Sequence, residues 1–142
     1  MGVQQAAQGK SGLIAHNQAQ YGTANTSFQC LDIVADELPP AELCLIRQVL
    51  QHLSNAEILH VLDKIKTYRY VLITEHYPAP SVRPRPNVDK PHGSDIRIYD
   101  DSAVYLDQPP FNVPNPVLVL EVEASKGIVN EGEKIRTFLI EN

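Results

Sequence analysis

Apolar residues occur in short runs separated by polar turns, a pattern typical of an α/β protein. Within Ser27–Tyr77 the order is an apolar strand, an acidic turn, a second strand, a helix and a third strand. The predicted strands are Phe28–Val34, Leu43–Ile46 and Tyr70–Thr74. Because the second strand is apolar at successive positions, we expect it in the centre of a parallel sheet with helices on both faces.

Spacing and capping residues predict two helices. Leu13–Tyr21 has apolar positions near a 3.6-residue period and is followed by Gly22, a residue favoured just after a helix C-terminus. The second helix begins after Ser54, which forms the S-x-x-E capping box with Glu57, and it ends near Thr67.

The second half of the chain predicts a long connection and then short strands. Pro78–Pro91 holds five prolines and has no regular period, so it is either an ordered lid or a mobile loop. Strands are predicted at Val104–Leu106, Val117–Val122 and Ile135–Ile140. The length of 142 residues suits one domain, residues 1–142.

Composition narrows the choice of partners and compartment. With 12 basic and 17 acidic residues the net charge is −5, which disfavours nucleic acid binding. No run approaches about 18 apolar residues and the first residues lack the apolar core of a signal peptide, so we expect no membrane partner and a cytoplasmic protein. Cys30 and Cys44 lie in predicted strands and are expected as reduced core residues. The histidines are not spaced around them as metal ligands, and no metal site is predicted.

Two segments resemble class I S-adenosylmethionine-dependent methyltransferases. LPPAELCLIRQVLQHLSNAEI, Leu38–Ile58, resembles the fourth strand of that family and its following helix, and VLITEH, Val71–His76, looks like the fifth strand. Leu13–Gly22 is similar to the helix that follows the second strand. A weaker likeness extends to the last two predicted strands, so the resemblance covers most of the chain.

The resemblance implies a sheet with strands in the order 3, 2, 1, 4, 5, 7, 6. The first two strands and the glycine-rich turn that holds the cofactor have no counterpart in this sequence. The fold class expected is therefore α/β, a truncated Rossmann-like methyltransferase sheet with a C-terminal antiparallel strand pair. The implied cofactor is S-adenosylmethionine, whose methyl group would pass to an unknown small-molecule substrate. Because its main binding elements are missing, we do not expect the chain to bind this cofactor alone.

Two residues match cofactor-binding positions of the family. Asp32, at the end of the presumed third strand, would accept a hydrogen bond from the adenine amino group, or it caps the turn before Asp36. Arg47, directly after the strand Leu43–Ile46, would contact a carboxylate of the substrate or of Asp32, or form a structural ion pair.

Three residues are candidates for catalysis. His52 and His76 follow consecutive strands, at the edge where open α/β sheets bind ligands, and a histidine there can act as a general base. Glu75 could orient His76 or bind a substrate amine, although neighbouring strand residues point to opposite faces. The structural alternative is that His52 hydrogen-bonds the backbone at the helix entrance and His76 simply ends a strand.

The missing strands leave one apolar strand edge, on Leu43–Ile46, without a neighbour. Either Phe28–Val34 moves across to pair with it, or a second copy of the chain covers it; we favour a homodimer. The main alternative to a methyltransferase-like protein is a non-catalytic binding or dimerisation module derived from the second half of that fold. A third possibility is that the chain is a fragment of a longer enzyme.

Overall fold

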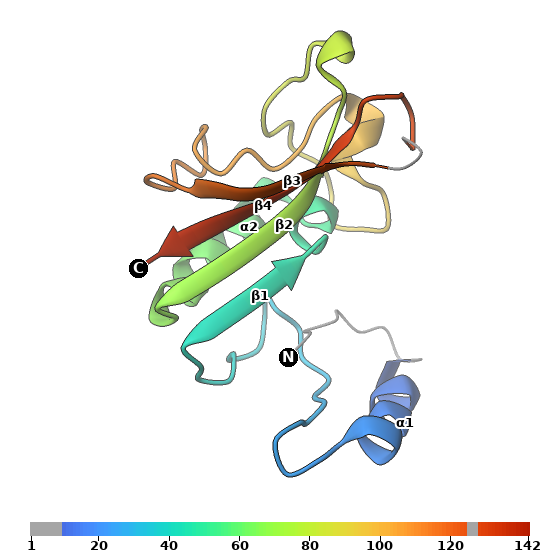
Figure 1. Ribbon diagram of the computed structural model, residues 1–142, viewed down its shortest axis with the longest axis vertical. Helices are drawn as coiled ribbons and strands as arrows, with labels where there is room; N and C mark the ends of the chain where they lie inside the picture. Colours follow the sequence, from blue (N-terminus) through green and yellow to red (C-terminus); the bar gives the residue numbers. More distant parts are fainter. Residues whose placement is uncertain (1–9, 125–127) are drawn as a thin grey trace.

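The computed structural model describes residues 10–124 and 128–142, which form a mixed four-stranded sheet and two α-helices (Figure 1). The strand order is β1-β2-β4-β3, and the strands are β1 (Leu43–Arg47), β2 (Tyr70–Tyr77), β3 (Val117–Glu123) and β4 (Lys134–Glu141). β1 and β2 are parallel, whereas β4 runs antiparallel to both β2 and β3. The mixed α/β class and the closing antiparallel pair are thus as predicted.

Helix α2 (Asn55–Lys64) begins at the predicted capping box. Ser54 Oγ accepts from the Glu57 N–H at 3.3 Å, and Glu57 Oε2 accepts from the Ser54 N–H at 2.8 Å. A 3-10 helix, η2 (Ile65–Thr67), then ends the helical segment near Thr67, also as predicted. The apolar side of α2 packs on one face of the sheet, and the core it forms includes Ile46, Leu50, Leu53, Ile58, Val61, Leu62, Ile65, Val71 and Ile73.

The sheet is covered on one face only, which corrects the expectation of helices on both faces. Figure 1 shows α2 behind the strands, with no helix in front of them. β1 is an edge strand and not a central one. Ile46 points towards α2 and is 3% exposed, whereas Leu45 points to the other side and is 51% exposed. Successive apolar residues therefore did not indicate two covered faces here.

The predicted strand Phe28–Val34 is wrong, because this segment is irregular and pairs with no strand. Asp32 Oδ1 accepts from the backbone N–H groups of Val34 and Ala35, at 2.8 and 3.2 Å, and closes a turn. Lys64 Nζ from α2 donates to the carbonyl of Ile33, so this main chain is bonded to a side chain instead of a neighbouring strand. The possibility that this segment moves across to pair with β1 is also excluded.

Two further predictions fail. Val104–Leu106 is buried but forms no strand, because the Tyr105 N–H donates to Asn87 Oδ1 at 2.7 Å and the Leu106 carbonyl accepts from a nearby loop residue. Cys30 is exposed, since the strand expected to bury it is absent, while Cys44 on β1 is half-buried.

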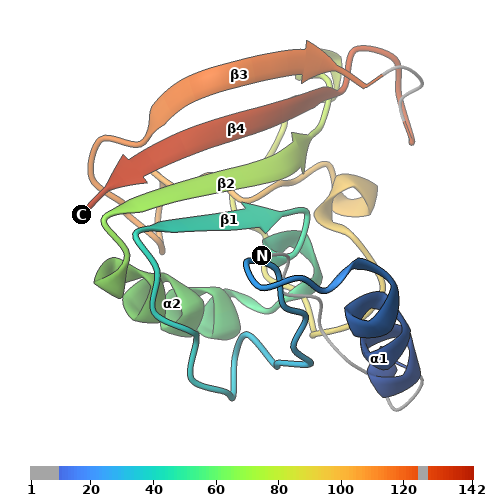
Figure 2. The same cartoon turned by 60° about the horizontal axis from the view of Figure 1, so that its bottom comes forward.

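Helix α1 (Lys10–Tyr21) stands apart from the sheet (Figures 1 and 2). It ends at Gly22 as predicted, and the Gly22 N–H donates to the Gln18 carbonyl at 3.0 Å. A Cβ atom on Gly22 would lie 2.3 Å from that carbonyl oxygen, so only glycine fits without a shift. Gln18 Oε1 accepts from the Phe28 N–H and ties the helix to the segment after it.

The proline-rich connection is the ordered alternative of the two considered. It contains the short 3-10 helix η3 (Pro80–Val82), and a second 3-10 helix, η4 (Arg97–Asp100), follows it. Asn87 is buried, and its Nδ2 donates to the carbonyls of Tyr105 and Pro109, each at 2.9 Å. Its φ of 54° lies in the left-handed region, which asparagine tolerates better than most residues. One amide thus holds distant parts of the loop together.

Candidate functional site

Polar side chains gather where the parallel strands β1 and β2 end. The 3-10 helix η1 (Leu50–His52) follows β1 at this edge, and the proline-rich loop packs beside it. Gln48 joins β1 to η1 with φ 52°, and its N–H donates to the Thr74 carbonyl at 2.7 Å. Left-handed backbone at a non-glycine residue is costly and is concentrated at functional sites. We name the four residues Gln51, His52, Glu75 and Arg97 the carboxyl-end cluster.

Glu75 holds η1 in place from β2. Its side chain is fully buried, and Oε1 accepts from the Leu50 N–H at 2.9 Å. Burial raises the pKa of Glu75 to about 8, although backbone N–H groups of the η1 turn and the nearby Arg97 oppose the shift. This carboxyl group can therefore gain or lose a proton near neutral pH.

Arg97 enters the same region from η4, which follows the proline-rich loop. It is 1% exposed, and it donates to the Val88 carbonyl at 2.6 Å and to the Leu53 carbonyl at 2.8 Å. Burial lowers the pKa of its guanidinium, whereas Asp89 and Glu75 act to raise it. Sequence reasoning missed this residue; the available signal was an arginine between the two isoleucines Ile96 and Ile98.

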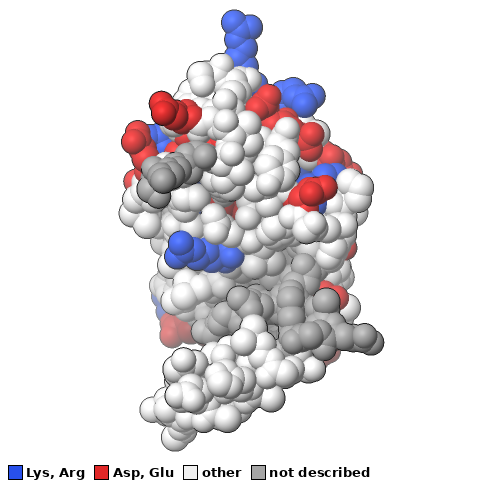
Figure 3. Space-filling view, turned by 90° about the vertical axis from the view of Figure 1, so that its right-hand side faces the viewer, with Lys and Arg blue, Asp and Glu red and all other residues white. Residues whose placement is uncertain are grey.

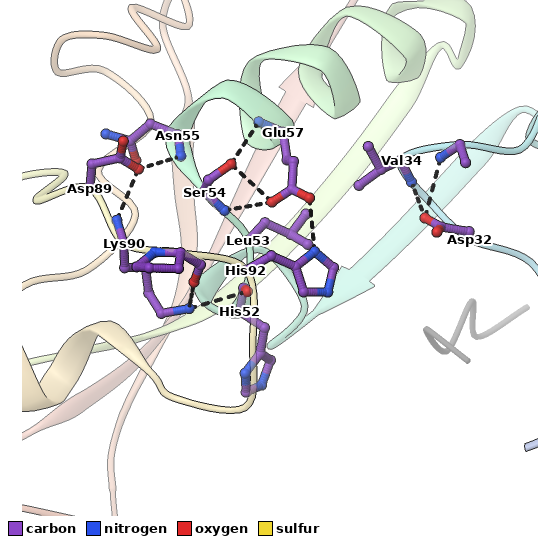
Figure 4. Close-up of polar contacts among 12 residues, drawn as sticks. Asp32, Val34, His52, Leu53, Ser54, Asn55, Glu57, Asp89, Lys90 and His92 are labelled. Carbon is purple, nitrogen blue, oxygen red and sulfur yellow. Dashed lines mark hydrogen bonds and ion pairs between the residues drawn. The ribbon is translucent and has the colours of Figure 1, made fainter. Parts of the chain in front are cut away.

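His52 is fixed through its main chain. Its carbonyl accepts from Lys90 Nζ at 3.2 Å and from the Gly93 N–H at 3.0 Å (Figure 4). These contacts involve the main-chain carbonyl of His52 and not its imidazole. The imidazole itself is half-buried, and its Nδ1 is buried with no hydrogen-bond partner among the residues described.

The loop is also anchored to the first turn of α2, as Figure 4 shows. Asp89 Oδ1 accepts from the Asn55 N–H at 2.7 Å and from the Lys90 N–H at 2.9 Å. His92 Nδ1 lies 2.8 Å from Glu57 Oε1, which links the loop to the capping box. Carboxylates near a helix N-terminus are favourable, so these contacts stabilise both the helix and the loop.

Several buried polar atoms around η1 have no hydrogen-bond partner within the described part of the chain. Native structures satisfy nearly all such atoms, with ordered water or an ion where the protein offers no partner. The atoms are Gln51 Oε1, His52 Nδ1, Asn55 Oδ1, Glu75 Oε2 and Arg97 Nε.

His76 lies on the other face of the sheet, as expected from its position next to Glu75. Its Nε2 is 2.9 Å from Glu133 Oε2, within ion-pair distance but not aligned as a hydrogen bond, and both side chains are buried. Burial acts to raise the pKa of Glu133, but backbone N–H groups of Asn130, Val129 and Ile128, together with His76, outweigh it and lower the pKa. The structure thus gives His76 a structural partner and separates it from the carboxyl-end cluster.

The two predicted cofactor residues are not part of this cluster. Asp32 caps its own turn before Asp36, which is the alternative considered for it. Arg47 is exposed at the end of β1 and, within residues 10–124 and 128–142, forms no ion pair with Asp32 or another acid. Among the described residues, the carboxylate and guanidinium expected to bind S-adenosylmethionine thus form no ion pair with each other, and the Asp32 carboxylate is bonded within its own turn.

The main hollows of the molecule lie away from the cluster. A groove of about 240 Å³ follows the free edge of β1, and its lining is mostly apolar, with Ile33, Leu38 and Tyr68 on its walls. A larger groove of about 630 Å³ lies between α2, Phe111–Pro114 and the end of β4. Because neither contains the buried polar atoms, we take the cluster and not the grooves as the chemical site.

Other classes of site receive no support from the described residues. They bring no three His, Cys, Asp or Glu side chains together where a metal could bind. None of their helices is both long and apolar enough to cross a bilayer. On the face in Figure 3, basic and acidic side chains are interspersed without a broad patch of either sign.

Comparisons with known proteins assign the chain to no family. No protein-family model matches the chain, and no curated protein matches it significantly. The interpretation of the site therefore depends on its own geometry.

Proposed function

We propose that the protein is a methyltransferase-like domain that retains the acceptor side of the site and lacks the cofactor side. The observation that supports this most is the strand order β1-β2-β4-β3, in which β4 alone is reversed. It corresponds to strands 4, 5, 7 and 6 of the order implied by the resemblance. The other strands of that order would lie beyond the free edge of β1.

The location of the carboxyl-end cluster agrees with this proposal, because open α/β sheets bind ligands beyond the carboxyl ends of their strands. Within the cluster, Glu75 is a positioning residue, since its carboxylate holds the turn that carries Gln51 and His52. His52 is the remaining candidate for a general base, because its ring is only half-buried. The substrate proposed is a small polar molecule.

We derive no methyl transfer through S-adenosylmethionine, because the Asp32 carboxylate is bonded within its own turn and Arg47 is exposed at the end of β1. On its own, the chain is proposed to be inactive as a transferase. A cytoplasmic location and a homodimer remain part of this proposal.

A second candidate function is a non-catalytic binding or dimerisation module built on the same half of the fold. The bare face of the sheet favours it, because exposed apolar patches on soluble proteins mark interaction sites. In this case the buried polar atoms around η1 serve only to fix the loop.

Calorimetric titration of the chain with S-adenosylmethionine, and separately with its demethylated product, tests the proposal. We expect no saturable heat at up to millimolar ligand. A micromolar Kd that is lost in Asp32→Asn but kept in the exposed control Asp107→Asn would contradict it and favour a complete enzyme.

A further inference from the structure

The sheet has an apolar face that no element of the described chain covers. We call it the open face, and it consists of the sheet side chains that point away from α2. Register fixes its members, because Leu45 pairs with Leu72, Leu72 with Leu139, and Leu139 with Val117. Side chains at directly paired positions lie on the same side of a sheet. The apolar residues of this face are Leu43, Leu45, Leu72, Val117, Leu120, Val122, Ile135 and Leu139.

The open face is apolar from one edge of the sheet to the other. Leu45 on β1 is 51% exposed, and Val117 and Leu120 on β3 are 56% and 53% exposed. Next to this row, Thr74 and Thr137 hydrogen-bond to each other at 2.8 Å, so their hydroxyl groups need no further partner. The surface can therefore be buried without leaving these polar groups unpaired.

Charge on this face is confined to two opposite ends. Arg47 lies at the carboxyl end of β1, and Glu141 lies at the amino end of β2, where it pairs with Tyr70. His76 also points to this side but is buried against Glu133. A two-fold axis running across the strands would place the arginine end of one sheet over the glutamate end of another.

The size of the face suits a dimer. Four strands about 4.8 Å apart, each with about six residues rising about 3.3 Å, give a flat area of roughly 380 Å². Two such faces have a combined flat area of roughly 760 Å². Because half-exposed leucine and valine side chains protrude from the sheet, the accessible surface that the two copies would bury is larger and approaches the roughly 1,200 Å² of a small stable interface. The largest apolar patch on a typical monomer covers roughly 300–600 Å² and is often an interaction site, so a patch of this extent is consistent with a binding surface.

We propose that a second copy of this chain covers the open face, so that two sheets pack face to face about a two-fold axis. Packed sheets lie about 10 Å apart with their strands within about 30° of each other, which allows the leucine and valine rows to interdigitate. The edge of β1 is not part of this contact. The interface does not depend on the proposed methyltransferase-like function, because no residue of the carboxyl-end cluster belongs to it.

Light scattering on the full chain after gel filtration tests the dimer. At tens of micromolar protein, we expect twice 15.8 kDa, which is 31.6 kDa. Leu120→Lys should lower this mass to 15.8 kDa, because it places a charge on the buried face, at the middle of the edge strand β3. The matched control is Leu59→Lys, an equally large change at an exposed leucine of α2, which should leave the dimer intact.

A wild-type monomer at these concentrations would overturn the proposal. It would also be overturned if Leu120→Lys stayed dimeric, since that result would place the contact at the β1 edge or in a groove. Val117→Lys on the same face serves as the second variant, and the circular dichroism of each variant shows whether it is folded. A failed cofactor titration would leave these masses unchanged, so the two proposals fail separately.

Discussion

At the level of single residues, the most unusual feature is an acid buried where the strands end. Glu75 bonds to backbone N–H groups and not to a direct ionic partner, and Arg97 satisfies two carbonyls instead of pairing with a carboxylate. The two side chains therefore act mainly on the main chain around η1. They would affect a bound ligand only by fixing the positions of Gln51 and His52.

Glu75 should make stability depend on pH. Its pKa rises from 4.5 to about 8 on folding, so the folded state binds more protons than the unfolded state between these values. The free energy of unfolding should thus fall as pH rises through this window, by up to a few kcal/mol. Urea unfolding of Glu75→Gln at pH 5, 6.5 and 8 should show a flatter dependence. An unchanged slope, equal to that of the exposed control Glu131→Gln, would contradict this reasoning.

Arg97 should be essential for stability in spite of its charge. Arg97→Met keeps much of the buried volume but leaves the carbonyls of Val88 and Leu53 without their donors. We expect a loss of about 2–4 kcal/mol in the free energy of unfolding, because buried polar groups without partners are costly. Chemical denaturation measures it, with exposed Arg83→Met as the control. A loss of less than about 0.5 kcal/mol would mean that the loop rearranges to satisfy both carbonyls.

At the level of elements, the sequence predicted those that are specified by local signals. Ser54 and Glu57 located the start of α2, Gly22 located the end of α1, and the apolar runs located β1, β2 and the final strand pair. The failures share a cause. At Phe28–Val34 and Val104–Leu106, the side chains of Asp32 and Asn87 hydrogen-bond to the backbone and prevent strand pairing. The strand propensities of the residues contain no information about such contacts.

The candidate site was predictable only in part, for a related reason. Glu75 and His52 could be found because they lie at or after the ends of apolar runs, and the opposite placement of Glu75 and His76 follows from strand alternation. Arg97 reaches the site through a long loop whose path depends on Asn87 and on contacts far apart in the sequence. No local pattern encodes that path.

The capping box provides a direct test of the start of α2. Ser54→Ala removes the acceptor of the Glu57 N–H and should lower the free energy of unfolding by about 1 kcal/mol. Thermal or urea unfolding measures the change, with exposed Ser81→Ala in the loop as the control. Equal stability of both variants would show that the cap contributes nothing, and that the loop contacts of Asn55 and Glu57 alone fix this end.

At the level of the whole molecule, the sheet ends where an α/β domain would normally continue. β1 has an apolar, half-exposed edge, and one entire face of the sheet carries leucine and valine without a covering helix. Both features leave apolar side chains of the sheet exposed in the described part of the chain. A second copy packed on the open face would bury its leucine and valine side chains, and it would leave the backbone edge of β1 unpaired.

Amide hydrogen exchange along β1 tests most directly whether the sheet ends there. The Tyr70 N–H donates to the Glu42 carbonyl, and the Gln48 N–H donates to the Thr74 carbonyl. The backbone N–H groups of even-numbered β1 residues therefore point towards β2, whereas those of odd-numbered residues point away from the sheet. We predict slow exchange at Cys44 and Ile46 and fast exchange at Leu43 and Leu45, in the dimer as well. Equal protection at all four amides would show that another strand pairs with β1, and would contradict a sheet in which β1 is the edge strand.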